Sequence, residues 1–152
     1  MPALEEKRLF PTPAHAQLDI FAGKWNTSGI MQTGQGEPVT ITGTDTYEWL
    51  PGGYFLLHKV KVMMGKEHKE SLEIIGYDPD LNVYTMHAFD DQGVVTIMHA
   101  RHRQGIWTFQ GDTLRFTGGF GYEHKILSGE WKHLIAGEWK HLMNITLTRQ
   151  NP

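Results

Sequence analysis

The feature that most constrains the fold is a series of short strand-like segments that begins at Lys24 and continues to the C-terminus. They recur at roughly 8–12 residues, the spacing that is typical of all-β barrels and sandwiches. Turn-forming groups such as Pro51-Gly52-Gly53 and Asp78-Pro79-Asp80 separate them. The 17 glycines, 5 Trp, 5 Tyr and 7 Phe favour the same interpretation, because aromatic residues suit strands and glycine suits tight turns. The pattern predicts an all-β protein of about ten strands.

A short helix is predicted over residues 13–21, between a loose polar leader at residues 1–12 and the first strand. Residues 13–150 are expected to form one domain. The predicted strands cover residues 24–31, 39–50, 54–64, a segment around 72–76, 83–89, 94–103, 105–110, 113–119, 127–134 and 138–149.

Composition excludes several classes of function. The chain of 152 residues contains no cysteine, so disulfide scaffolds, zinc–thiolate sites and cysteine nucleophiles are absent. Its formal net charge of −3 lacks the basic character that nucleic-acid binding requires. Residues 1–13 show no apolar signal segment, and no apolar run approaches the ~18 residues of a membrane span. A cytoplasmic protein without nucleic-acid or membrane partners is expected.

The sequence Phe21-Ala22-Gly23-Lys24-Trp25 joins the predicted helix to the first strand. Glycine allows a sharp turn there without a Cβ clash, and tryptophan supplies a large apolar ring. Gly23 and Trp25 are therefore predicted to be structural residues that close one end of the molecule, with Trp25 buried.

Alternation along the strands predicts which side chains point inward. Leu56, His58 and Val60 share one face of their strand, whereas Lys59 and Lys61 share the other and are expected to face solvent. The same argument places further residues on the inner wall: Ile41, Tyr47, Trp49, Val62, Leu72, Ile74 and Gly76.

Nine histidines are the one unusual feature of the composition. His58 is predicted to face inward with Leu56, and His141 is predicted to face inward with Met143 on the last strand. Each is either a core histidine held by a neighbouring polar group or a ligand-binding group. Thr27, Asp45 and Tyr47 are the inward residues that could partner them. His99 and His102 lie three apart, which puts them on opposite faces of a strand, so no metal site is predicted.

An octet beginning at Gly129-Glu130-Trp131 is echoed eight residues later from Gly137-Glu138-Trp139. Two copies are too few for a repeat architecture. We interpret the pair as a β-hairpin that turns near Ala136-Gly137.

Four stretches together resemble a known family: Phe21–Trp25, Gly43–Phe55, Leu72–Asp78, and Trp139 with Met143–Arg149. In this order they are similar to an uncharacterised bacterial family of lipocalin-like proteins, a domain of unknown function in the calycin superfamily. The resemblance covers residues 17–150. It implies an up-and-down antiparallel β-barrel with a short N-terminal helix closing one end. Relatives with known roles are lipocalins, fatty-acid-binding proteins and haem-binding nitrobindins, which hold small molecules inside the barrel.

The leading functional hypothesis is a binding module that holds a small, mostly apolar molecule inside the barrel. No catalytic residues and no obligatory cofactor are predicted. The residues predicted to bind the ligand are Tyr47, Trp49, Leu56, His58, Val60, Ile74, Trp107, Phe116, His141 and Met143.

Three alternatives remain open. The first is a haem-binding protein with His58 or His141 as axial ligand. The second is a small barrel enzyme that uses one of these histidines as acid or base. The third is a filled barrel with an external role such as homodimerisation.

Overall fold

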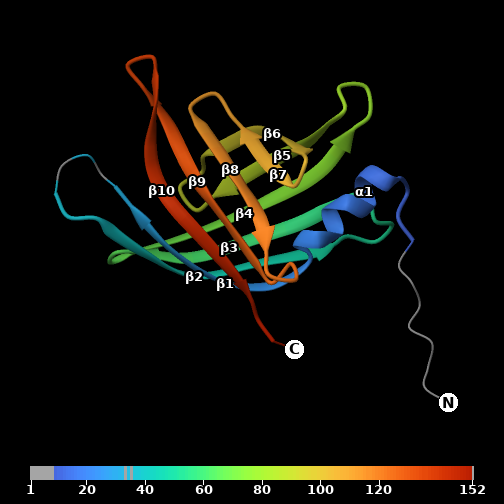
Figure 1. Ribbon diagram of the computed structural model, residues 1–152, viewed down its shortest axis with the longest axis horizontal. Helices are drawn as coiled ribbons and strands as arrows, with labels where there is room; N and C mark the ends of the chain where they lie inside the picture. Colours follow the sequence, from blue (N-terminus) through green and yellow to red (C-terminus); the bar gives the residue numbers. More distant parts are fainter. Residues whose placement is uncertain (1–8, 33, 35, 152) are drawn as a thin grey trace.

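The computed structural model describes residues 9–32, 34 and 36–151, which form a ten-stranded antiparallel barrel with a short helical segment at one end (Figure 1). The predicted leader lies outside the described residues as far as residue 8. The helical segment is α1 (Pro13–Gln17), followed by a 3₁₀ turn, η1 (Leu18–Phe21). The strands are β1 (Gly23–Met31), β2 (Val39–Trp49), β3 (Leu56–Met64), β4 (Glu67–Asp78), β5 (Val83–Asp90), β6 (Val95–Arg103), β7 (Ile106–Gln110), β8 (Leu114–Gly121), β9 (Ile126–Ile135) and β10 (Glu138–Arg149).

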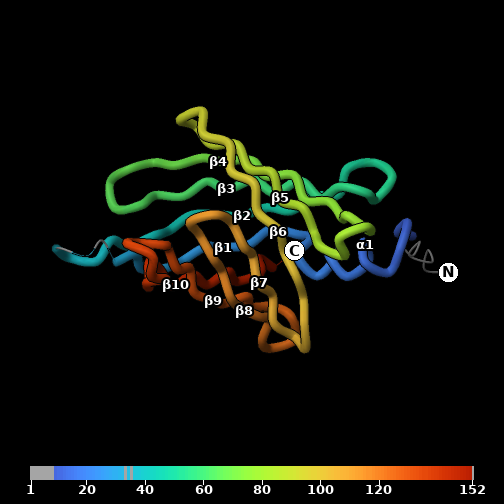
Figure 2. Tube along the Cα trace, turned by 90° about the horizontal axis from the view of Figure 1, so that it is seen from above, coloured from blue at the N-terminus to red at the C-terminus, as the bar shows by residue number. Residues whose placement is uncertain are grey.

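The topology is up-and-down, as predicted. Each strand pairs with its neighbours in the sequence, and β1 also pairs with β10, which closes the barrel. The helical segment lies at one end, and the hairpin between β3 and β4 reaches toward the other (Figure 2). None of the helices in the described part of the chain is long and apolar enough to cross a membrane.

The end of the barrel beside α1 is closed by the helical segment and Trp25. Thr12 caps α1 by accepting a hydrogen bond from the backbone nitrogen of His15. Leu18 and Phe21 are buried on the inner side of the turn that follows. Trp25 is fully buried, as predicted, and its Nε1 donates to the carbonyl oxygen of Phe21 at 2.8 Å.

Arg149, near the end of β10, completes this closure. Its guanidinium lies 4.0 Å from the centre of the Trp25 ring, a cation–π contact. The same group donates to the carbonyl oxygens of Ala22 and Ile20. Gly23 has a φ of +130°, and a Cβ there would lie 2.6 Å from Nη1 of Arg149. Glycine is thus required at this turn for both its conformation and its small size.

The echoed octets form the β9–β10 hairpin, as predicted. Ala136 and Gly137 make its two-residue turn, and both have positive φ. The register shifts between His141 and Met143, because Leu142 is inserted as a β-bulge. Trp131 therefore packs 5.3 Å from Phe116 inside the barrel, whereas its counterpart Trp139 lies beneath the guanidinium of Arg115.

The orientation of β3 agrees with the alternation argument. Leu56 and Val62 are buried on the inner wall, whereas Lys59 and Lys61 are exposed.

The prediction for β4 was one residue out of register. Leu72, Ile74 and Gly76 were expected to face inward, but Glu73 and Ile75 hold the inner positions. Ile75 pairs with buried Leu56, whereas Ile74 pairs with Leu57 on the outer side.

We expect Trp25→Ala to lower the free energy of unfolding by about 3–5 kcal/mol, because it removes a fully buried ring and leaves a cavity. Trp139→Ala is the matched control, since it removes the same side chain from a half-buried position on the outer face; its cost should be nearer 1 kcal/mol. Urea denaturation of both variants measures the difference. Equal losses would contradict the role assigned to Trp25.

Candidate functional site

A cluster of polar side chains lies on the inner wall of four adjacent strands. Tyr47, His58 and Glu73 face one another directly in the registers of β2, β3 and β4. Asp45 is one inner position further from α1 on β2, and Thr27 on β1 is its diagonal neighbour, opposite Gly43. Directly opposed and diagonal neighbours on one face of a sheet are close enough for such side chains to interact. The strand registers therefore create the cluster.

His58 is held between two carboxylates. Its Nε2 lies 2.6 Å from Oδ2 of Asp45, and its Nδ1 lies 2.9 Å from Oε1 of Glu73. Asp45 and Glu73 are each 7 % exposed, and the side chain of His58 is 12 % exposed. An ionised carboxylate can only accept hydrogen bonds, so the geometry requires both ring nitrogens to carry protons. His58 is thus an imidazolium that donates to both neighbours.

The electrostatics agree with this assignment. Burial by itself lowers the pKa of His58, but the hydrogen bonds and negative charges of Asp45 and Glu73 outweigh it and raise the pKa to about 9. Burial and the same two carboxylates raise the pKa of Tyr47 well above its ordinary value. At neutral pH, Tyr47 is therefore a neutral phenol and His58 an imidazolium.

Tyr47 and Thr27 fix the geometry of the cluster. The Tyr47 ring stacks on the imidazole at 3.9 Å between centroids, with 8° between the planes. The hydroxyl of Thr27 donates to Oδ1 of Asp45, so both oxygens of that carboxylate have partners. His58 is positioned from both sides and from one face of its ring.

The sequence predicted part of this cluster. Thr27, Asp45 and Tyr47 were expected as inward partners of a core histidine, and Asp45 is indeed bonded to His58. Glu73 was missed because of the register error in β4. No signal in the sequence corrects that error, since Leu72, Ile74 and Ile75 leave apolar residues on both faces of the strand.

Three of the predicted ligand-binding residues belong to the packed end of the barrel beside α1. Trp49, Leu56 and Trp107 are buried there in one apolar cluster with Phe21 and Leu18. The cavity at this end, which Phe21 and Trp107 help to line, has a volume of about 10 Å³, roughly the space of one water. The core fills this end of the barrel.

The inner wall beyond the cluster is mixed, because Ile41 and Val62 are buried whereas other inner positions are more accessible. Val60 and Met143, both predicted to bind the ligand, are half-buried, as are Ser71 and Ala88. Phe116 is buried and stacks on Phe109 at 4.8 Å. The polar cluster thus lies between a filled half of the interior and a half in which several inner residues are only half-buried.

Two of the predicted ligand-binding residues, His141 and Ile74, face the other way. The bulge at Leu142 reverses the alternation, so His141 pairs with Lys132 on the outer side, and its Nδ1 lies 2.6 Å from Oε2 of Glu130. Ile74 is on the outer side because of the register of β4. The structure does not bring either residue together with His58.

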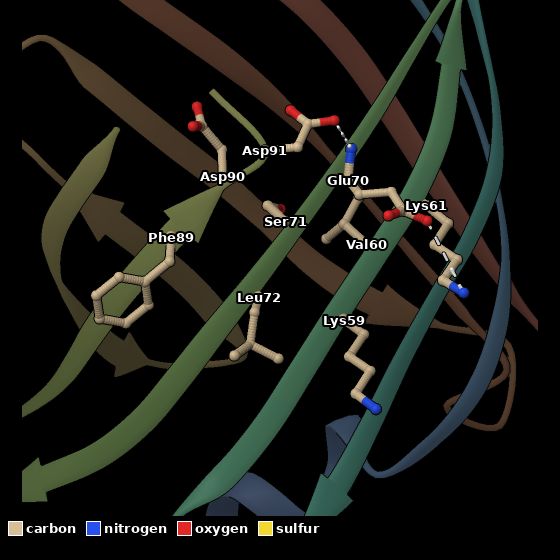
Figure 3. A pocket seen from close by; sticks show the side chains of 9 residues that line it. All are labelled: Lys59, Val60, Lys61, Glu70, Ser71, Leu72, Phe89, Asp90 and Asp91. Carbon is tan, nitrogen blue, oxygen red and sulfur yellow. Dashed lines mark hydrogen bonds and ion pairs between the residues drawn. The ribbon is translucent and has the colours of Figure 1, made fainter. Parts of the chain in front are cut away.

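An open depression of about 280 Å³ lies over β3, β4 and β5 (Figure 3). Lys59, Lys61, Leu72, Phe89 and Asp91 line it from outward positions. It continues into a set of outward apolar residues that we call the outer apolar face: Leu57, Leu72, Ile74, Phe89, Val95 and Ile97.

The family model described as "Protein of unknown function (DUF1579)" matches residues 10–125, which is more than half of the chain. The chain belongs to this family. No curated protein sequence matches the chain.

The solved structures that match this chain include the following two. The crystal structure of Rv2717c from M. tuberculosis has a TM-score of 0.67 at 10 % identity, over 92 % of this chain and 99 % of that one. A fluorescence-activating β-barrel of de novo design has a TM-score of 0.47 at 12 % identity, over 87 % and 95 % of the two chains. The first similarity supports the barrel fold alone.

The geometry of His58 predicts a pH dependence of stability. The folded pKa of about 9 exceeds the ordinary value of 6.5, so the stabilising contribution is complete below pH 6.5 and is lost as the pH rises through 9. The difference in unfolding free energy between the wild type and His58→Gln should therefore shrink across this interval. Below pH 6.5 it should reach about 3–5 kcal/mol, the cost of breaking a buried ion pair. An NMR titration of the His58 ring with a midpoint at or below 6.5 would refute the assignment.

Proposed function

We propose that this chain is a lipocalin-like binding module that holds a small, mostly apolar molecule in the half of the barrel interior opposite α1. A bacterial origin and a cytoplasmic location belong to the same proposal. The polar cluster around His58 forms the floor of the site, and half-buried residues such as Val60 and Met143 form its walls. No reaction is assigned.

One observation carries the proposal: the interior changes character at the cluster. Inner residues on the α1 side are packed in one apolar cluster, whereas several on the far side, such as Ser71 and Ala88, are only half-buried, although Ile41 and Val62 there are buried. Burying three ionised groups at this boundary is unfavourable unless their partners compensate. Titratable groups with perturbed pKa values in a concave site are typical of binding and catalytic sites.

The enzyme alternative has less support. A general acid or base needs a proton or a lone pair that faces the substrate. Both ring nitrogens of His58 are occupied by Asp45 and Glu73, so the imidazolium offers neither.

The residues also do not fit haem. An axial histidine requires a free nitrogen lone pair, and His58 has none while its carboxylate partners hold it. His141 lies on the outer side, where Glu130 accepts from its Nδ1.

The proposal is tested with three octyl compounds that differ in head group: octanol, octylammonium and octanoate. At least one of them should bind the wild type and shift the ¹³C-methyl NMR signal of Met143, which lies on the inner wall. Ala88→Trp should weaken that binding by about ten- to a hundred-fold, because Ala88 is directly opposite Glu73 and a larger ring would occupy the space above it.

His87→Trp is the matched control, because it adds a ring at the next position of β5, on the outer side. It should leave binding unchanged. If none of the three compounds shifts the Met143 signal, the proposed function is wrong.

A second candidate function is self-association through the outer apolar face. Phe89 is 43 % exposed and Ile97 is 54 % exposed, and apolar residues gathered on one surface mark interaction sites. A second copy of the chain suits the charges at the edge of the face. A two-fold axis parallel to the strands would bring Lys59 and Lys61 of β3 toward Asp91, which follows β5, in the other copy.

Ile97→Lys should therefore abolish a dimer that sedimentation velocity detects in the wild type, because it buries an unpaired charge in the interface. Ile106→Lys, at 50 % exposure on β7 and outside the face, should leave the dimer intact. A wild-type chain that stays monomeric at every concentration would exclude this candidate.

A further inference from the structure

The hydrogen bonds of the cluster determine which of its atoms can meet a ligand. His58 donates both N–H groups to carboxylates, so it has no donor left and no lone pair to accept with. Both oxygens of Asp45 are also engaged, by Thr27 and His58. His58, which the sequence suggested as a ligand-binding group, therefore has no atom free to form a hydrogen bond with a ligand.

Glu73 is the exception within the cluster. Its Oε1 accepts from His58, but among residues 9–32, 34 and 36–151 no group donates to its Oε2. In the described part of the chain no fully buried polar side-chain atom lacks a partner, so Oε2 keeps some contact with solvent. The side chain is nevertheless only 9 % exposed, at an inner position of β4 opposite Ala88. A carboxylate oxygen that is largely withdrawn from water and has no protein donor favours a ligand that supplies one.

The charges of the cluster also favour a ligand that donates hydrogen bonds. Two carboxylates and one imidazolium leave the cluster with one net negative charge. Tyr47 is neutral, and the next inner residue of β4, Ser71, carries no charge. The nearest inward cation on that strand is Lys69, which is exposed two positions further toward the mouth.

We propose that the ligand of this site carries a positively charged or hydrogen-bond-donating head group, such as a primary ammonium, that binds Oε2 of Glu73. This inference rests on the proposed function. The apolar part of the ligand extends past Val60 and Met143 toward the mouth. A carboxylate head group is disfavoured, because it would approach a net negative site without finding a free donor on His58.

The test compares octylammonium with octanoate on the full chain by isothermal titration calorimetry. Octylammonium should bind about ten- to a hundred-fold more tightly, the range expected for one charge-assisted hydrogen bond. Glu73→Gln should reduce this preference to a few-fold, because it removes the charge and keeps the shape of the side chain.

Glu70→Gln is the matched control on the same strand. Glu70 lies on the outer side near Lys61, so the variant loses the same charge without changing the interior. It should retain the full preference for octylammonium.

Ser71→Lys keeps the inference testable if Glu73→Gln does not fold. The new ammonium would lie one inner position from Glu73 and compete for its free oxygen, so octylammonium binding should fall by about tenfold or more.

The outcomes separate the two proposals. If neither octyl compound nor octanol binds, the proposed function fails. If octanoate binds as well as or better than octylammonium, the barrel is still a container, but the ligand class inferred here is wrong. If the preference survives in both Glu73→Gln and Ser71→Lys, Glu73 is not the recognition group.

Discussion

The contact between Arg149 and Trp25 joins the first and last strands of the barrel at the end beside α1. Trp25 belongs to the first strand and Arg149 to the last, and these strands pair to seal the barrel. The guanidinium lies on the indole and also binds two carbonyl oxygens at the end of the helical segment. One side chain thus fixes the first strand, the last strand and the helical turn that covers the end. A planar group with several donors suits this role better than lysine would.

Closure at one end makes the two halves of the barrel interior different. The helical segment and its aromatic neighbours fill the adjacent half, where the remaining cavity has a volume of about 10 Å³. The buried cluster lies where this packing stops. The single positive charge of His58 neutralises Asp45 and Glu73 only in part, so the boundary carries negative charge in a region of low dielectric constant. The filled half and the charged floor are the two features on which the proposed binding site rests.

The outer apolar face explains why the interior was harder to predict than the fold. Strand alternation identifies the inner wall only where the outer side is polar, as Lys59 and Lys61 make it on β3. On β4 the outward residues Leu72 and Ile74 are apolar, so the pattern does not distinguish the two faces. Alternation therefore assigned Leu72 and Ile74 to the inner wall, and Glu73 was missed. On β10 the inserted Leu142 reversed the face of His141, and a bulge of one residue has no reliable sequence signal.

The sequence by itself determined the all-β class, the approximate bounds of the strands, the burial of Trp25 and the inward direction of His58. Turns, aromatic content and alternation are local properties, and each can be recognised within a few residues. Only the tertiary structure decided that Asp45 and Glu73 meet at one imidazole, because those residues lie 28 positions apart on different strands. Their meeting depends on the registers of two strand pairs, and a slip of one residue in either would turn a carboxylate out of the barrel.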